Sequence, residues 1–366
     1  MNRLARAIIQ IIPHFLAFNK SKVNAYAAQS ETSQLTPFII DRKEVGPHDV
    51  QIDILYCGVW HSDIHQVRNE WGGSIFPMVP GHEIVGRIVK VGASVTNFTV
   101  GELAGVSCFV DSCRTCPGCL AKEEQFCDKG MVGTYNARDK EGNPTYGGYS
   151  TQIVTDEKYT LHVAESLAIE GVAPLLCAGI TTCSPLRHWN IGKGHKVAIV
   201  GLGGLGQMGV KFAVSFGAAV TVLSTSASKE KDALNLGAHH FAVTKNEATM
   251  KTLAGTFDFI LNTVSAQHDY NAYLNLLTVN GTMVVVDVPP EATPVHAFSS
   301  IMKRRCLAGS LIGGIKETQE MLDYCAEHNI VAEVEVINAS YINEAYERML
   351  KADVRYRFVI DITSLQ

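Results

Sequence analysis

The sequence has no excess of positive charge: 31 lysines and arginines stand against 36 aspartates and glutamates, a net charge of −5 at pH 7. No basic stripe is therefore available for nucleic-acid phosphates, and the composition excludes a nucleic-acid partner. After residue 22, no stretch reaches the length of about 18 consecutive apolar residues that a membrane span needs. The sequence also lacks internal repeats and low-complexity segments. These absences argue against a nucleic-acid-binding protein and against an integral membrane protein.

Residues 1–22 lack acidic side chains but contain four basic ones, around an apolar stretch from Ala7 to Phe18. This stretch is interrupted by Pro13 and is too short to span a bilayer. A secretory signal or an organellar presequence is one interpretation. We favour a disordered N-terminal extension or an upstream start codon, and we expect a cytoplasmic protein. Ten cysteines, four of them clustered at metal spacing, are typical of a reducing compartment.

A chain of 366 residues predicts two domains, because single cores stop growing at about 250–300 residues. Up to about residue 159 the pattern predicts short strands and loops, with strands at 47–59 and 84–92. Beyond about residue 173, predicted strands alternate with helices, which indicates βαβ units and a doubly wound parallel sheet. The predicted strands of this second part are 196–200, 220–223, 257–261 and 282–286.

Four cysteines lie within fifteen residues, in a C-x2-C-x2-C-x7-C pattern formed by Cys113, Cys116, Cys119 and Cys127. Four thiolates on one short loop can close a tetrahedral shell around Zn²⁺ and leave no open position. A cysteine-rich surface loop or a pair of disulfides is the alternative. The C-x2-C steps favour metal, because they hold their sulfurs on one side of a tight turn. We therefore predict a structural zinc site.

A glycine-rich loop follows the predicted strand 196–200 and precedes a predicted helix. Gly201 permits a tight turn, Gly203 lets the backbone approach a pyrophosphate, and Gly206 permits close packing of helix on strand. Gly204 and Leu205 complete the turn, where the free N–H groups of the helix N-terminus attract an anion. A purely structural strand–turn–helix is the alternative to a dinucleotide site.

The end of the next strand contains no acidic residue. An NAD site needs Asp or Glu there to bind the ribose 2′-hydroxyl, whereas this chain has Ser224, Thr225, Ser226 and Lys229. Hydroxyl donors and a cation are suited to a 2′-phosphate, so we predict NADP(H) as the cofactor. The same residues can also serve as a turn and a helix cap.

The order of these features, a zinc lobe inside a β domain and then a nucleotide domain, resembles the zinc-dependent medium-chain alcohol dehydrogenases. Within that family the chain is most similar to the cinnamyl alcohol dehydrogenase-like, NADPH-dependent aldehyde reductases, a resemblance that runs from about Val23 to Thr363. It is carried by the motifs at 56–65, 79–86, 176–182, 184–188, 301–305 and 356–360, which include YCGVWHSDIH, VPGHEIVG and LCAGITT.

The resemblance implies an α/β fold with two domains. A GroES-like, mostly β catalytic domain is expected over 23–176 and 314–366, with its zinc lobe near 108–130. A Rossmann domain is expected over 177–313. The family pairs through the edge of the nucleotide-domain sheet, so a homodimer formed through Leu307–Ile312 is also implied.

A second, catalytic zinc is implied in the cleft between the domains, held by His82, Cys177 and, in some states, Glu83. The family has cysteine as the remaining ligand, whereas this chain has Trp60 at that position. The indole N–H has no lone pair for a metal. Cys57 is no substitute, because three residues earlier on a strand its side chain should point to the opposite face.

Ser62 and His65 are implied as a proton relay from the reacting oxygen to solvent. Serine and histidine can each give and accept a proton, and histidine titrates near neutral pH. Outside this motif, His65 would be interpreted as an ordinary polar histidine.

Three residues are implied as cofactor contacts: His61 and Arg357 toward the pyrophosphate and Thr181 beside the nicotinamide. For Arg357 a surface cation is the alternative. Asp287 stands where the family usually has glycine, so its carboxylate either disturbs cofactor placement or points away. Candidates for the substrate wall, each of which could equally belong to the core, are Trp71, Cys108 and Phe109.

Two functions follow from these residues. The first is a zinc-dependent NADP(H) alcohol dehydrogenase that reduces aryl, allylic or aliphatic aldehydes and is impaired by Trp60. The second is an NADP-binding protein with structural zinc only and little or no dehydrogenase activity. A relative of the quinone reductases that never used zinc is disfavoured, because His82, Glu83 and Cys177 are all present.

Overall fold

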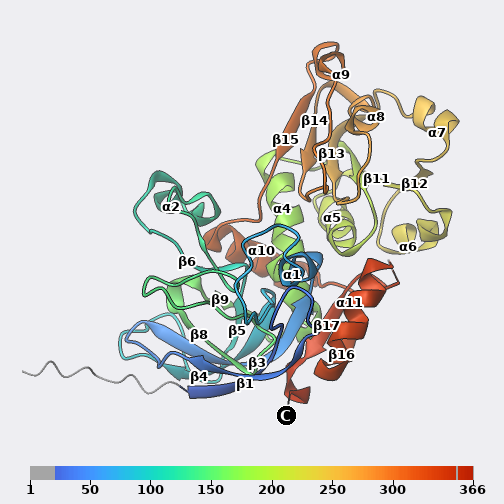
Figure 1. Ribbon diagram of the computed structural model, residues 1–366. Helices are drawn as coiled ribbons and strands as arrows, with labels where there is room; N and C mark the ends of the chain where they lie inside the picture. Colours follow the sequence, from blue (N-terminus) through green and yellow to red (C-terminus); the bar gives the residue numbers. More distant parts are fainter. Residues whose placement is uncertain (1–20, 352, 366) are drawn as a thin grey trace, which may run out of the picture.

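The computed structural model describes residues 21–351 and 353–365 (Figure 1). The predicted N-terminal extension therefore lies outside the described residues, except that Ser21 and Lys22 begin a strand. That strand, β1 (Ser21–Ala27), forms an antiparallel hairpin with β2 (Thr36–Arg42). In the described part of the chain, no single helix is long and apolar enough to cross a membrane. One bent pair of helices, Ile169–Leu176 with Ala178–His188, would be long and apolar enough together, by length and composition only.

The first domain is built on a seven-stranded sheet with the order β16-β17-β3-β4-β5-β9, in which β8 also pairs with β3. Its central strand, β3 (Asp49–Val59), alternates buried and half-buried residues up to Ile54, as a strand with one face on the core should. The C-terminal strand β17 (Phe358–Asp361) pairs antiparallel with β3. Two segments far apart in the sequence therefore share one sheet. The other strands are β4 (Ile84–Val91), β5 (Leu103–Val106), β8 (Gln152–Asp156), β9 (Leu161–His162) and β16 (Glu335–Asn338).

The second domain contains six parallel strands in the order β12-β11-β10-β13-β14-β15. The strand order reverses direction between β10 and β13, and in open α/β sheets such a switch point is where ligands bind. These strands confirm the predicted doubly wound sheet and, with the first domain, the predicted fold class. They are β10 (Lys196–Val200), β11 (Ala219–Ser224), β12 (His240–Val243), β13 (Phe257–Asn262), β14 (Leu277–Val285) and β15 (Cys306–Gly309).

Helices surround this sheet and join it to the first domain. Helix α4 (Ala178–His188) lies between the two domains in Figure 1 and is buried along most of its length. One apolar core is continuous from β4 and β5, through α4, to β10 and β11, so the domains share a packed junction. The predicted boundaries near 176 and 313 stay a prediction. The remaining helices are α1 (His61–Val67), α2 (Pro117–Leu120), α3 (Ile169–Val172), α5 (Gly204–Ser215), α6 (Glu230–Asn235), α7 (Glu247–Thr252), α8 (Tyr270–Leu274), α9 (Ala297–Ile301), α10 (Ile315–His328) and α11 (Ile342–Leu350).

Candidate active site

A cavity of about 400 Å³ lies between the two domains. Its wall combines side chains from the start of α1, from the zinc-lobe side of the first domain and from the carboxyl end of β14. This is the position in which the switch point of the parallel sheet predicts a ligand. The lining residues used below are Trp60, Ser62, Trp71, His82, Cys108, Cys177, Thr181, Leu205 and Asp287.

A buried carboxylate, Asp63, organises the entrance to α1. Its Oδ2 accepts from the backbone N–H of Trp60 at 2.8 Å, and its Oδ1 accepts from that of Gly81 at 3.1 Å. Oδ1 also lies 3.1 Å from Nδ1 of His82. Burial alone would raise the pKa of Asp63, but the His82 ring and these N–H groups hold it below its usual value. The sequence analysis missed this residue, although an acid three residues into a helix is a capping signal.

Asp63 fixes the orientation of His82. With Nδ1 donating to the carboxylate, the lone pair of Nε2 is directed into the cavity, and Oγ of Ser62 lies 3.5 Å from Nε2. Histidine ligands of metals generally have such a carboxylate partner, which sets the tautomer and the ring position. His82 is therefore held as a metal ligand should be.

Three donor atoms meet in the cavity: Nε2 of His82 and the thiols of Cys108 and Cys177. All three atoms lie within 4.8 Å of one another, and the side chains of His82 and Cys177 are buried. Two sulfurs and one imidazole nitrogen are donors that Zn²⁺ prefers. The structure thus brings together the predicted His82 and Cys177, and it adds Cys108, which the sequence analysis placed only on the substrate wall.

Glu83 lies apart from this group. Its Oε1 is paired with Nη2 of Arg357, and both side chains are fully buried. Burial raises the pKa of Glu83, although the neighbouring guanidinium opposes the shift. The indole ring of Trp60 stacks on this pair, with the guanidinium carbon of Arg357 3.5 Å from the ring centroid. A surface position for Arg357, the alternative interpretation of the sequence, is wrong.

Trp71 lines the cavity, and His65 packs against Trp71. Nδ1 of His65 is paired with the Glu70 carboxylate, and the His65 ring stacks on Trp71 with centroids 5.0 Å apart. Ser62 lines the cavity from the first turn of α1, on the side of His82. The structure does not join Ser62 to His65 directly, so the relay between them stays a prediction. Phe109 is fully buried and belongs to the core beside Tyr159 rather than to the cavity wall.

The glycine-rich loop has the geometry that its sequence predicts. Gly201 has a φ of +90°, in the left-handed region that favours glycine, and a Cβ at Gly206 would collide with the carbonyl oxygen of Gly201. Nothing lies within 4 Å of a Cβ built at Gly203, so the space in front of α5 is open there. Nη1 of Arg357 is buried, has no hydrogen-bond partner and lies 3.0 Å from the Cβ position of Gly204. A guanidinium N–H group without a partner, at a helix N-terminus, fits the pyrophosphate of a dinucleotide.

Lys229 folds back on the same loop, where its Nζ donates to the carbonyl oxygen of Leu202 at 2.9 Å. Ser224 is buried at the end of β11, and its Oγ accepts from the backbone N–H of Ser226 at 3.3 Å. Thr225 is exposed beside them. A cation and several hydroxyls therefore surround the end of β11, which fits a 2′-phosphate, and the same contacts form the predicted turn.

Two titratable groups near the loop have shifted pKa values. Burial, with the Arg357 guanidinium and the His65 ring nearby, lowers the pKa of His61 to about 4, so this imidazole is neutral at pH 7. Burial raises the pKa of Asp287 to about 6, although its own contact with the backbone N–H of Val288 opposes the shift. Asp287 lines the cavity, so of the two alternatives for it the structure favours a carboxylate near the cofactor region.

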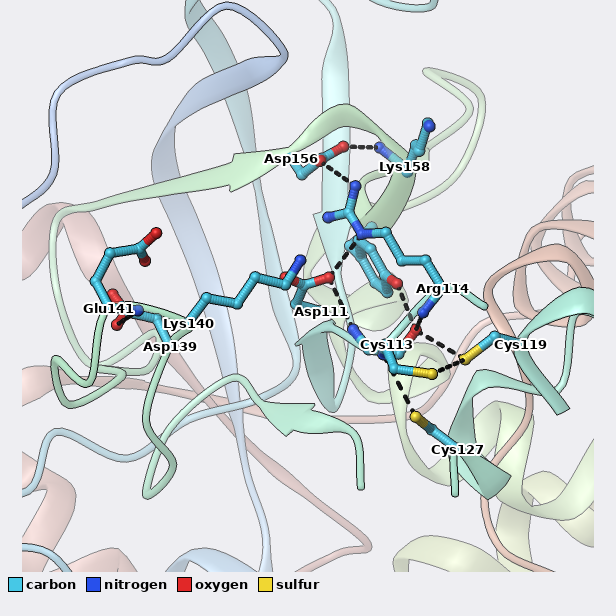
Figure 2. A network of polar contacts seen from close by, with 12 residues as sticks. Asp111, Cys113, Arg114, Cys119, Cys127, Asp139, Lys140, Glu141, Asp156 and Lys158 are labelled. Atoms are coloured by element: carbon cyan, nitrogen blue, oxygen red, sulfur yellow. Dashed lines mark hydrogen bonds and ion pairs between the residues drawn. The ribbon is translucent and has the colours of Figure 1, made fainter. Parts of the chain in front are cut away.

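The four lobe cysteines converge in a second group, with all their sulfurs within 4.8 Å of one another. Figure 2 shows three of them, Cys113, Cys119 and Cys127. The sulfurs of Cys113 and Cys119 are 3.9 Å apart, close to the separation of about 3.8 Å in a tetrahedral zinc–thiolate shell. This separation also excludes a disulfide, whose sulfurs are about 2.0 Å apart. Backbone N–H groups of Thr115 and Cys116 lower the pKa of the Cys113 thiol to about 6, which favours the thiolate that a metal requires.

Ion pairs fasten this lobe to the sheet. Arg114 lies between Asp111 and Asp156, with contacts of 2.8 Å to each, and Lys140 also contacts Asp111 (Figure 2). At the other end of the lobe, Oε2 of Glu124 accepts from the backbone N–H of Ile315 at the start of α10. The lobe is thus attached to both segments of the first domain.

Known proteins resemble this chain over nearly its whole length. The model of the alcohol dehydrogenase GroES-like domain matches residues 46–165, and that of the zinc-binding dehydrogenases matches residues 204–327. NADP-dependent alcohol dehydrogenase C 1 of Mycolicibacterium smegmatis is 57% identical over 347 residues, which cover 94% of this chain and 99% of that protein. Aldehyde reductase YahK of Escherichia coli is 54% identical over 351 residues, with coverages of 94% and 99%. The crystal structure of CAD from Helicobacter pylori complexed with NADP(H) superposes with a TM-score of 0.89 at 43% identity, covering 94% of this chain and 99% of that one.

Proposed function

This chain belongs to the zinc-dependent medium-chain alcohol dehydrogenases, in the cinnamyl alcohol dehydrogenase-like branch, and we propose that it is an NADP(H)-dependent aldehyde reductase slowed by Trp60. The observation that carries the proposal is the shared cavity: metal donors on one wall face a dinucleotide loop on the other. The relatives named for NADP-dependent alcohol dehydrogenase and aldehyde reductase activity support the reaction class. Assaying aldehyde-dependent oxidation of NADPH by the purified protein tests it.

Different residues of the cavity have different roles in this reaction. When bound, zinc supplies Lewis-acid polarisation of the carbonyl oxygen, and NADPH supplies the hydride. Asp63 holds His82 with Nε2 directed into the cavity. We propose that Ser62, whose Oγ lies 3.5 Å from Nε2 of His82, donates a proton to the reacting oxygen, and that His65, paired with Glu70, replaces that proton.

The substrate end of the cavity is mainly apolar. Trp71, Met131, Leu311 and Ile312 line it, and only a few polar groups interrupt the lining. Such walls favour aryl, allylic or aliphatic aldehydes over charged or strongly hydroxylated ones.

Trp60 impairs the site in two ways. It removes the thiolate that the family has at this position, and its ring covers cofactor-binding groups. A Cβ at Gly204 would lie 2.5 Å from Cζ3 of Trp60, so the ring packs against the start of α5, where it also stacks on Arg357. The missing thiolate, together with the engagement of Glu83 by Arg357, favours the second candidate function, an NADP-binding protein with structural zinc only.

The contact of Lys229 with the glycine-rich loop predicts a cofactor preference. We expect Lys229→Ala to weaken NADPH binding about tenfold and to leave NADH binding unchanged, because a charge-assisted contact to the 2′-phosphate contributes about 1.5 kcal/mol. Fluorescence titration with both cofactors measures the effect. Lys231→Ala, an exposed neighbour on α6, is the matched control. Equal weakening of both cofactors would show that Lys229 only supports the loop.

The raised pKa of Asp287 predicts a pH dependence. Because its pKa is about 6 in the folded protein, the carboxyl is protonated below that pH and becomes an anion above it. We expect NADPH affinity to fall about fivefold as pH rises from 5 to 7.5, a repulsion of about 1 kcal/mol between this anion and the cofactor phosphates. Asp287→Asn should remove this fall. The 2′-phosphate titrates in both proteins and cancels in their ratio, so a ratio that does not change with pH would contradict the prediction.

We also propose a homodimer formed through the edge of the nucleotide-domain sheet. Strand β15 is that edge, and Leu307 and Leu311 beside it are 37% and 46% exposed. An unpaired edge with apolar side chains is suited to pairing with a second copy. A monomer in sedimentation velocity at micromolar concentration would contradict the proposal.

A further inference from the structure

We propose that Cys108 replaces the thiolate that is missing at position 60, so that the cavity binds zinc through His82, Cys108 and Cys177. This inference rests on the proposed function only in assigning zinc to this cavity, and it concerns the retention of the metal rather than the rate of the reaction. Under this proposal Cys108 is a zinc ligand rather than a residue of the substrate wall.

The three donor atoms are already nearly in position. They lie within 4.8 Å of one another, whereas zinc bonds of about 2.0 Å to nitrogen and 2.3 Å to sulfur set ligand atoms roughly 3.5–3.8 Å apart. Closing the site therefore requires the atoms to move together by roughly 1.3 Å at most, a shift of the size that side-chain rotations produce.

Hydrogen bonds hold the two cysteines side by side. Oγ of Ser107 donates to the carbonyl oxygen of Leu176 at 2.5 Å, which ties the residue before Cys108 to the residue before Cys177. The backbone N–H of Thr134 donates to the carbonyl oxygen of Cys108 at 3.0 Å, and Sγ of Cys108 itself lies 3.9 Å from the Leu176 oxygen. The hydrogen bond between Ser107 and Leu176 thus keeps the two thiols close together, where the segment after β5 meets the start of α4.

The resulting ligand set has the composition of a catalytic zinc site. Two thiolates and one histidine leave a fourth position open, which is the Cys₂His arrangement known for alcohol dehydrogenases. Other candidates for the third ligand are engaged elsewhere: Glu83 pairs with Arg357, and Sγ of Cys57 faces the carbonyl oxygen of Gly58. Trp60 offers no lone pair. Within the described chain, Cys108 is the thiol that the structure places with His82 and Cys177.

Zinc per chain, measured by elemental analysis on the full-length protein and its variants, tests the proposal. We expect two zinc ions in the native protein, one in Cys108→Ser, and two in Cys306→Ser, whose exposed cysteine on β15 is the control. The variant W60C should hold two, and so should W60C/C108S, because a cysteine at position 60 makes Cys108 dispensable. Two zinc ions in C108S, or one in the native protein, would overturn the proposal.

Alkylation of the native protein gives a second test that needs no variant to fold. With the metal bound, Cys108 should react with iodoacetamide at least tenfold more slowly than it does after the more labile zinc has been removed by a chelator. Equal alkylation of Cys108 before and after chelation would overturn the ligand assignment. If W60C holds two zinc ions and still reduces no aldehyde, the proposed function fails while the zinc counts continue to decide the role of Cys108.

Discussion

Replacing Trp60 by cysteine is expected to raise kcat/KM for aldehyde reduction by about 100- to 1000-fold. The substitution returns a thiolate to the position where the family has one, and the metal can then bind where the hydride donor reaches its substrate. A displaced Lewis acid loses several kcal/mol of transition-state stabilisation, and each 1.4 kcal/mol corresponds to a factor of about ten in rate. Initial rates with NADPH and an aryl aldehyde measure the change.

The control variant Trp60→Ala separates the two effects of the indole ring. It uncovers Arg357 and Gly204 without supplying a ligand, so NADPH should bind more tightly while kcat stays within about threefold of the unmodified protein. W60C should improve both quantities. If W60C and W60A reduce aldehydes at the same rate, the defect is steric and the missing thiolate is not its cause. If neither differs from the unmodified protein, Trp60 is not the defect.

These rates are independent of the zinc count in the cavity. When Cys108 completes the ligand set, the metal is held on the side of the zinc lobe and α4, because that is where Cys108 and Cys177 are anchored. A thiolate at position 60 would bind from the start of α1 instead, on the side of His61 and Ser62. The same number of zinc ions can therefore accompany very different activities, and the two measurements have to be made on the same preparations.

Local patterns predicted the nucleotide-binding part of the site well. The strand β10, the turn at Gly201 and the helix α5 follow one another directly in the sequence, so their geometry depends on neighbouring residues. The same holds for the four lobe cysteines, whose spacing within one loop brings their sulfurs together. For these elements the sequence contained nearly all of the structural information.

Contacts between distant segments could not be predicted in this way. Arg357, just before the last strand of the chain, is buried under Trp60 at the entrance of α1. No periodic pattern of hydrophobic residues in the sequence predicts this contact. The proximity of Cys108 to Cys177 depends on how β5 and the start of α4 pack, through a side-chain contact of Ser107. Phe109, next in the chain to Cys108, faces the core instead. Adjacent residues on a strand point to opposite faces, and only the packing decides which face meets the cavity.

Replacing Cys119 by serine is expected to produce the largest loss of stability. Cys119 is 5% exposed, and its sulfur lies 3.1 Å from Oγ of Ser112 and 3.9 Å from the sulfur of Cys113. The lobe has little apolar core of its own, so bound metal supplies much of its folding free energy, as in small zinc domains. We expect the loss of one zinc per chain and at least about 3 kcal/mol, which lowers Tm by roughly 4 °C or more for a chain of this length.

Elemental analysis and thermal unfolding of the same preparation measure this effect, with Cys306→Ser as the control for an exposed cysteine. The damage should spread beyond the lobe, because Glu124 contacts the start of α10, and Glu317 on that helix accepts from Ser184 on α4 at 3.0 Å. Hydrogen exchange should therefore increase first in residues 112–128 and then at the start of α10. An unchanged Tm with one zinc lost would show that the ion pairs of Arg114 with Asp111 and Asp156 hold the lobe without metal.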